Sequence, residues 1–213
     1  MTAPFTLFHG VGACSRTQLI LLEQAGADYE LRVLRMHEGE HKTEEYLRLN
    51  PKGKVPLLVH EGRPLTENVA IATYLARLFP QAQLMPAVED AWAWSQAVSW
   101  LSYVATGLHP TIGRARLPMK FADGEEAQAS VKARGLADLY DLLKVADDRL
   151  RTQPWLAAGH FTAPDAYLFW ATGRSVDCGV DLSRVPAVQA HHKRVAEMPA
   201  TMRALDKEAK AAG

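Results

Sequence analysis

The segment VPLLVHEGRPLTENVAIATYLARLF (residues 55–79) carries the pattern that decides the fold of the first part of the chain. Two short apolar runs flank the pair Glu61–Gly62, which is typical of a tight turn between two strands. From Glu67 onward apolar residues recur at helical spacing until Pro80 ends the pattern. The segment therefore predicts a strand, a turn, a second strand and a helix.

The residues before this segment read as short alternating elements. The turn residues Asn50–Gly53 separate them from the strand that follows. We expect a strand over 5–8, a helix over 15–26, a strand over 29–34 and a short helix over 43–49. The order βαβαββα is typical of an α/β domain, a small mixed sheet with helices on its faces.

The pattern changes after Pro80. Residues 81–90 form an expected linker, and the remainder shows helical periodicity without a convincing strand. We expect helices over 92–108, 125–151, 163–176, 186–197 and 199–210, the last three each opened by a proline. The domains expected are thus residues 1–80 and an all-helical domain of residues 91–213. Thr162 and Asp165 predict a capping box at one helix start.

Composition narrows the class of protein. Of 213 residues 48% are hydrophobic, and 24 basic residues balance 24 acidic ones, which argues against a nucleic-acid binder. No apolar run reaches the length of a membrane span, and the first residues lack the pattern of a signal peptide. The two cysteines, Cys14 and Cys178, form no metal or CxxC spacing. We expect a cytoplasmic protein without a nucleic-acid or membrane partner.

Cys14 lies in HGVGACSRTQLILL (residues 9–22), where a glycine-containing turn precedes a helical run. A thiol at a helix start feels the positive end of the helix dipole, which favours the thiolate. A buried structural thiol explains the local sequence equally well. Because Cys14-Ser15-Arg16-Thr17 holds no second cysteine, only a single-thiol mechanism with an external thiol is open to it.

Two other places allow a functional and a simpler interpretation. Pro56 opens a strand; a trans bond is the usual state, whereas a cis bond would turn the backbone of Val55 toward a peptide ligand. Thr66, Glu67 and Asn68 open a helix, whose start can receive a carboxylate while Glu67 pairs with an ammonium group. In the simpler interpretation, Thr66 caps the helix and Glu67 only complements its dipole.

Two histidine features also need an interpretation. The stretch His37–His41 matches HExxH, but Gly39 and its place in a loop after a strand argue against a zinc site, and we expect no metal. His109 is either part of a substrate wall or a histidine bonded between helices.

Three segments, taken in their order and spacing, resemble the bacterial beta-class glutathione S-transferases: Gly12–Ser15, Asn50–Pro56 and Leu65–Ala76. In the second half, Trp100–Thr106 with His109 is similar to the substrate-side helix of that class. Gly159–Tyr167 is similar to the capped helix of the superfamily. The resemblance covers nearly the whole chain.

The resemblance implies a thioredoxin-like N-terminal domain, an all-helical C-terminal domain and a homodimer. It implies an enzyme that takes glutathione as co-substrate and a small hydrophobic electrophile as its other substrate. The implied catalytic residues are Cys14, Ser15 and His109. The implied glutathione-binding residues are Lys42, Lys54, Val55, Pro56, Glu67, Asn68, Ser102 and Thr106.

Within that set the resemblance implies particular roles. The cysteine matching Cys14 faces the glutathione sulfur and can form a mixed disulfide with it. The backbone of Val55, before a cis proline, pairs with the cysteinyl part of glutathione. Glu67 and Asn68 hold the γ-glutamyl end at a helix start.

The chain also departs from the class. Ser102, Gly107 and Pro110 stand where the class often has Asn, an acid and Lys, and the lysine for the glycyl carboxylate has no clear counterpart unless Lys42 serves after a loop shift. Three alternatives therefore stay open: glutathione-dependent thiol–disulfide exchange through Cys14, glutathione-dependent isomerisation with Arg114 or Arg116 in the cleft, and a non-catalytic binding protein on the same fold.

Overall fold

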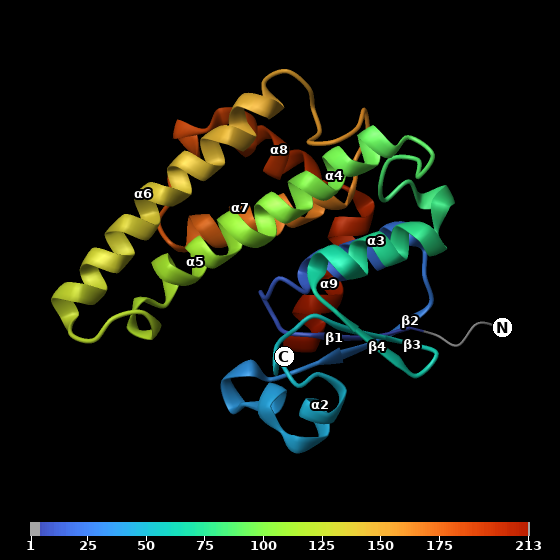
Figure 1. Cartoon of the computed structure of the whole chain (residues 1–213), viewed down its shortest axis with the longest axis horizontal. Helices are drawn as coiled ribbons and strands as arrows, with labels where there is room; N and C mark the ends of the chain where they lie inside the picture. The colour runs from blue at the N-terminus through green and yellow to red at the C-terminus, as the bar shows by residue number, and fades with distance from the viewer. Residues whose placement is uncertain (1–4, 213) are drawn as a thin grey trace. The chain divides into compact units, whose positions relative to one another are not determined.

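The computed structural model describes residues 5–212, and the chain divides into two compact units (Figure 1). Unit 1 holds residues 1–87 together with residues 197–213, and unit 2 holds residues 88–196. The first unit contains a mixed sheet with helices, and the second is helical among the residues described. This is the α/β plus all-α fold, with a thioredoxin-like first domain, that the sequence predicts.

The sheet of unit 1 has four strands in the order β2-β1-β3-β4: β1 (Phe5–His9), β2 (Tyr29–Val33), β3 (Leu57–His60) and β4 (Arg63–Thr66). β1 and β2 are parallel because a helix connects them, and the other pairs are antiparallel. At the turn between β3 and β4, Glu61 and Gly62 both have positive φ, the conformation that a two-residue hairpin needs.

Helices cover both faces of this sheet (Figure 1). α1 (Arg16–Ala25) and α3 (Asn68–Leu78) pack against each other, and α1 buries Leu19–Leu22. α2 (Glu44–Leu49) follows two 3₁₀ turns, Met36–Glu38 and Glu40–Lys42, and its Tyr46 packs in a cluster with Phe8 and Leu57. The first residues of α1 and α3 lie next to the segment before β3, and the candidate site is formed there.

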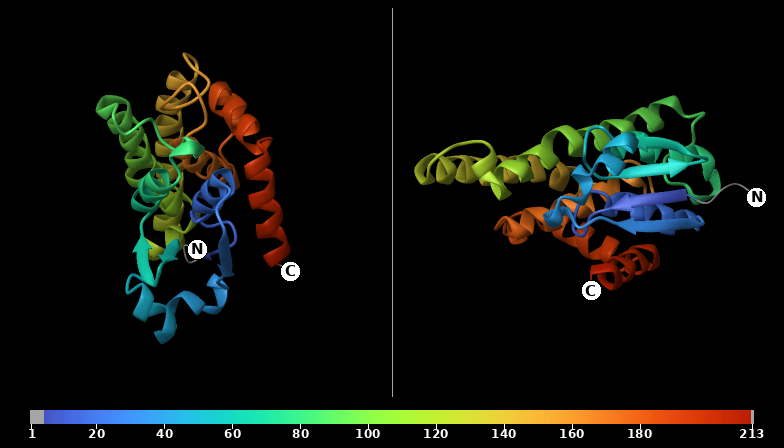
Figure 2. Two further views of the ribbon diagram at one scale, coloured as in Figure 1. Left: turned by 90° about the vertical axis from the view of Figure 1, so that its right-hand side faces the viewer. Right: turned by 90° about the horizontal axis from the view of Figure 1, so that it is seen from below.

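The last helix, α9 (Pro199–Ala212), lies along α1 in unit 1 (Figure 2). Glu23 of α1 accepts hydrogen bonds from Arg203 (Nε to Oε2, 2.9 Å) and from Lys207, and Ala204 is fully buried. The sequence expectation placed this helix with the other helices of residues 91–213. Periodicity showed that the helix has an apolar face, but it could not show which surface covers that face.

Unit 2 contains α4 (Ala91–Tyr103), α5 (His109–Arg116), α6 (Glu125–Leu150), α7 (Ala163–Asp177) and α8 (Pro186–Ala196). The helix expected to end at Leu108 instead continues through a π-helical turn, Val104–Leu108, into α5. Pro110 has no N–H to donate, and the wider turn before it accommodates the ring without ending the helix. None of the helices among residues 5–212 is both long and apolar enough to cross a membrane.

The predicted capping box is present at the start of α7. The Asp165 carboxylate accepts from the Thr162 N–H at 2.8 Å, and it also accepts from the Leu156 N–H at 2.9 Å. Nε2 of His191, on α8, lies 3.0 Å from Oδ1 of this buried carboxylate, the oxygen that accepts from Leu156. Asp165 therefore connects the start of α7 to α8 and to the segment that precedes α7.

Candidate functional site

Cys14 and the Val55–Pro56 pair meet in unit 1, although the sequence separates them widely. Cys14 lies in the turn before α1 and is 6% exposed; its Sγ donates a hydrogen bond to the Val55 carbonyl at 3.4 Å. The Val55–Pro56 peptide bond is cis, and β3 begins directly after it. A buried thiol thus lies beside the backbone segment that the resemblance assigns to the cysteinyl part of glutathione.

The protonation of Cys14 differs from the expectation drawn from its helix-start position. Burial raises the pKa of the Cys14 thiol to about 11, since desolvation penalises the thiolate. The side-chain amide of Asn68 and the backbone N–H groups at positions 14 and 15 lower this pKa, and the Glu67 carboxylate raises it. The N–H groups at the helix start thus favour the thiolate, as expected, but burial outweighs them and the net shift of the Cys14 pKa is upward.

Ser15 supports the loop that carries Cys14. Its fully buried hydroxyl accepts from the Gly10 N–H at 3.2 Å and lies 2.8 Å from Nδ1 of His9. Nε2 of His9 lies 2.9 Å from Glu208 of α9. Hydrogen bonds therefore connect Ser15, through His9, to the last helix of the chain.

Glu208 closes this network on the other side. Its carboxylate also accepts from the Gly12 N–H at 2.7 Å and from Arg16 Nε at 2.7 Å. Burial alone would raise the pKa of Glu208, but the bonds from His9 and Gly12 and the charge of Arg16 lower it to about 2. A carboxylate from the last helix therefore holds the loop before Cys14, and no sequence motif indicated it.

The start of α3 differs from the simpler interpretation of Thr66–Asn68. Thr66 is the last residue of β4 and its hydroxyl accepts from Lys52 Nζ at 2.8 Å, so it does not cap the helix. Glu67 occupies the N-cap position with φ 76°, a conformation that costs a non-glycine residue free energy. Asn68 is the first residue of α3 and is buried. This strained backbone lies at the place that the resemblance assigns to the γ-glutamyl end.

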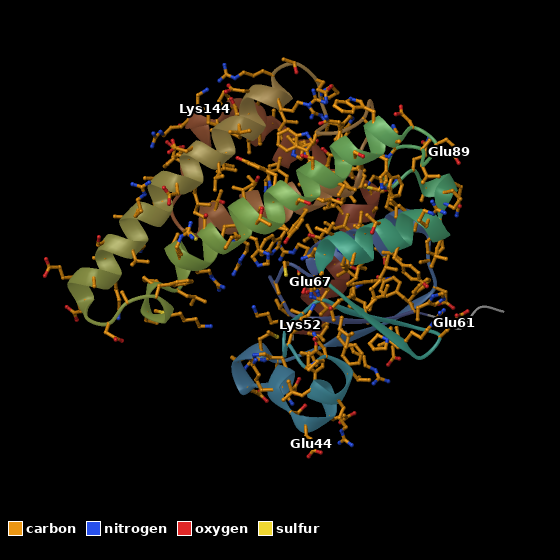
Figure 3. The ribbon with its side chains drawn as sticks, in the orientation of Figure 1. Glu44, Lys52, Glu61, Glu67, Glu89 and Lys144 are labelled. Atoms are coloured by element: carbon orange, nitrogen blue, oxygen red, sulfur yellow. The ribbon has the colours of Figure 1, made fainter. Side chains whose placement is uncertain are left out.

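Lys52 is a site residue that the sequence interpretation missed. Its ammonium group forms an ion pair with Glu67 at 2.5 Å, and the two side chains lie next to each other in Figure 3. In Asn50-Pro51-Lys52-Gly53-Lys54 the two lysines look equivalent. Lys54 takes part through its carbonyl, which accepts from Tyr46 OH and Asn50 Nδ2, both at 2.6 Å.

Lys42 lies close to the same turn. Gly53 has φ +57°, and a Cβ added to it would lie 2.6 Å from Lys42 Nζ. The ammonium group therefore lies over the backbone two residues before Val55. The role of Lys42 toward the glycyl carboxylate stays a prediction.

The other three expected site residues belong to unit 2. Thr106 is exposed and its hydroxyl donates to the Ser102 carbonyl at 2.8 Å, within the helix. His109 Nδ1 lies 2.8 Å from Tyr167 OH, and its ring packs on Trp170 with centroids 4.6 Å apart. His109 is therefore bonded between α5 and α7, as one of its two interpretations predicts.

The HExxH match has no helix to support it. His37 and His41 lie in separate 3₁₀ turns divided by Gly39, which has φ 78°. Their side chains cannot share one helical face, which zinc binding by this motif requires. Across residues 5–212, no group of three or more His, Cys, Asp or Glu side chains is placed to hold a metal ion.

Comparison with known proteins agrees with this geometry. The glutathione S-transferase N-terminal domain family matches residues 3–77, and the C-terminal domain family matches residues 94–199. Glutathione S-transferase GstA of Escherichia coli O157:H7 is 34% identical over 205 residues, 95% of this chain and 98% of that protein. Disulfide-bond oxidoreductase YfcG of Escherichia coli K12 is 28% identical and covers 87% of each chain.

Solved structures extend the comparison. A sphingomonad glutathione S-transferase complexed with glutathione is 32% identical with a TM-score of 0.85, covering 96% of this chain and 98% of its own. A bacterial beta class enzyme from Sphingomonas chungbukensis is 30% identical with a TM-score of 0.84, covering 95% and 98%. Since the family matches and the fold both extend over nearly the whole chain, the protein belongs to the glutathione S-transferase superfamily of enzymes and is of the bacterial beta-like kind.

Proposed function

We propose that the protein binds glutathione in unit 1 and joins it through its sulfur to small apolar electrophiles. The observation that carries the proposal is the contact between Cys14 and the cis Val55–Pro56 pair, with Sγ 3.4 Å from the Val55 carbonyl. That contact defines where a thiol-containing peptide would pair with the backbone. The sphingomonad relative that was solved with glutathione supports glutathione as this peptide.

Each end of glutathione has a chemically matched partner in unit 1. The Glu67 carboxylate pairs with the γ-glutamyl ammonium group, and in doing so it exchanges its bond to Lys52 for one to the ligand. The first N–H groups of α3 receive the γ-glutamyl carboxylate. Lys42, whose ammonium group lies over Gly53, is our candidate for the glycyl carboxylate.

The reaction needs the glutathione thiolate. Its sulfur attacks the electrophilic carbon, a sulfur–carbon bond forms, and the leaving group departs with its electron pair while the thiol proton passes to water. The protein contributes by lowering the pKa of the bound thiol and by holding it in place. Ser102 and Thr106 remain predicted glutathione-binding residues, and His109 remains a predicted catalytic residue.

A second function, glutathione-dependent thiol–disulfide exchange, rests on the same cysteine and on the similarity to YfcG. The Cys14 thiolate would attack the glutathione sulfur of a mixed disulfide between glutathione and a second thiol, and that second thiol would leave as its thiolate. A glutathione thiolate would then attack the Cys14–glutathione disulfide, which yields glutathione disulfide and frees Cys14. The raised pKa of Cys14 opposes the first step, since thiolate is the nucleophile. We therefore place this function second.

A Cys14→Ser variant separates the two functions, with Cys178→Ser as the matched control. For transfer, we expect glutathione binding by calorimetry and conjugation activity to survive in part in Cys14→Ser. For exchange, disulfide reduction would disappear in Cys14→Ser and persist in Cys178→Ser. Absence of glutathione binding by the unmodified protein would overturn both functions and favour a non-catalytic role.

We also expect a homodimer that works in the cytoplasm in detoxification, as the resemblance implies. Light scattering coupled to size exclusion checks the dimer. A monomer at all concentrations tested would contradict it.

A further inference from the structure

Gln18 is a buried amide that the proposed mechanism does not use. It lies on α1, is fully buried, and its Nε2 donates two hydrogen bonds to the first residue of α3. One bond goes to the Asn68 carbonyl at 3.1 Å and the other to Asn68 Oδ1 at 3.0 Å. Among the described residues its Oε1 has no hydrogen-bond partner, so the donation to Asn68 is the polar contact for which this side chain is placed.

These two bonds fix which way the Asn68 amide points. A backbone carbonyl can only accept, so the Gln18 atom that faces it must be the nitrogen. The same nitrogen faces the Asn68 side chain, and therefore the Asn68 atom nearest to it must be the oxygen. The NH₂ group of Asn68 is then turned away from Gln18, and hydrogen bonding by the Asn68 side chain lowers the pKa of the Cys14 thiol.

We infer that Gln18 is a positioning residue, which holds the Asn68 amide with its NH₂ group toward the sulfur of the site. The geometry behind it is the pair of bonds from one buried nitrogen to two acceptors of one residue. The inference concerns Cys14 itself and does not depend on glutathione being the ligand. Its failure is therefore distinguishable from failure of the proposed function.

The charged groups around Cys14 do not supply the hydrogen-bond donor for its sulfur. Glu67, at the start of α3, has an unfavourable charge for a thiolate. Arg16 of α1 and Glu208 of α9 are bonded to each other. The Asn68 amide is thus the side-chain donor for the sulfur, and its orientation matters because turning it would present an oxygen instead.

The test is the alkylation rate of Cys14 by iodoacetamide in the full-length protein, resolved from that of Cys178 by mass spectrometry, at several pH values below the pKa of the thiol. In Gln18→Met the Asn68 amide loses its anchor and donates less to the thiolate. We expect alkylation of Cys14 about tenfold slower at each pH, because a hydrogen bond to a charged group is worth about one pKa unit. Cys178, in the other unit, should keep its rate.

Whether alkylation of Cys14 becomes slower or faster distinguishes a positioning role of Gln18 from a role in packing alone. If Gln18 only filled space, replacing it would loosen a buried site and Cys14 would react at the same rate or faster, which would overturn the inference. Gln24→Met on the same helix is the matched control and should leave the rate unchanged. In an Asn68→Ala background, Gln18→Met should slow Cys14 no further, since the two residues act as one unit. A full further tenfold loss there would also overturn the inference.

A second variant covers the case in which Gln18→Met does not fold. Gln18→Glu keeps the shape of the side chain, but a carboxylate can only accept and a protonated carboxyl donates a single bond, so neither form supplies both bonds that hold the Asn68 amide. Slower alkylation of Cys14 supports the inference, and an unchanged or faster rate contradicts it.

Discussion

At the scale of single residues, Glu67 combines backbone strain with a functional position. Its φ of 76° belongs to a region that favours glycine, and such residues cost about 1–3 kcal/mol each. Glu61, in the hairpin turn, has φ 51° and is the natural comparison (Figure 3). Because both are exposed glutamates with positive φ, substitution by glycine relieves a similar strain at each.

We predict that Glu67→Gly raises the free energy of unfolding by about 1 kcal/mol and weakens glutathione binding at the same time. The stability gain comes from relieved strain, and the loss of affinity comes from the missing carboxylate. Thermal unfolding and calorimetry measure the two effects. Glu61→Gly should give the gain alone; a loss of affinity there as well, or no loss in Glu67→Gly, would contradict the assignment of Glu67.

At the scale of elements, the turn before β3 depends on Gly53. Its φ of +57° makes a side chain there conformationally costly, and an added Cβ would also lie 3.1 Å from the His41 carbonyl. Gly62 has a φ of +73° with nothing within 4 Å of an added Cβ. Comparing alanine substitutions at Gly53 and Gly62 therefore separates the free-energy cost of a positive φ from the cost of steric contact.

Gly62→Ala is expected to destabilise unit 1 by about 1 kcal/mol, and Gly53→Ala by about 2 kcal/mol or more. Only Gly53→Ala should also lower glutathione affinity, because it displaces Lys42. Denaturant unfolding and calorimetry give both quantities. Equal losses in the two variants would show that the contact with Lys42 and His41 is unimportant.

The element α9 carries a pH-dependent contribution to stability through Glu208. The pKa of Glu208 falls from 4.5 to about 2 on folding, so its stabilisation is complete above the unfolded value and disappears as the pH falls from about 4.5 to about 2. A shift of this size corresponds to about 3 kcal/mol at neutral pH.

We predict that Glu208→Gln destabilises the protein by about that amount near neutral pH and by little near pH 2, where the native carboxyl is itself protonated. Denaturant unfolding over a pH series measures the difference. Asp206→Asn, an exposed change on the same helix, should have almost no effect. A difference between Glu208→Gln and the native protein that stays constant down to pH 2 would contradict this account.

At the scale of the whole molecule, the chain returns to its first unit at its end. α9 contacts α1, and its buried residues include Ala200, Ala204 and Glu208. We propose that α9 folds with unit 1, although the preceding helices of the second half belong to unit 2. This assignment makes the site in unit 1 dependent on the last residues of the chain.

Hydrogen exchange tests this assignment. Ala204→Leu overpacks a fully buried position on α9 and costs about 1–3 kcal/mol. We expect faster amide exchange in α1 and β1 and unchanged exchange in α7 and α8. Ala171→Leu, at a fully buried position of α7, should give the reverse pattern. Faster exchange of α7 in the Ala204→Leu variant would place α9 with unit 2.

Much of the fold follows from local sequence, because periodicity and turn residues act over a few positions. The hairpin at Glu61–Gly62 and the capping box of Thr162 and Asp165 form where the pattern predicts them. The continuation past Pro110 was missed, since a proline ordinarily ends a helix and only the observed π-helical turn allows it to continue.

Local sequence patterns are sufficient to predict the two kinds of domain, the family resemblance and the segments that contain the site. The pKa of Cys14 depends on the folded structure, because desolvation depends on what covers the thiol. The folded structure also decided that Lys52 pairs with Glu67, that Glu208 reaches Gly12, and that Gln18 orients Asn68. Each of these joins residues far apart in the chain. Local patterns cannot encode such pairings, because burial and orientation arise only when separate elements pack together.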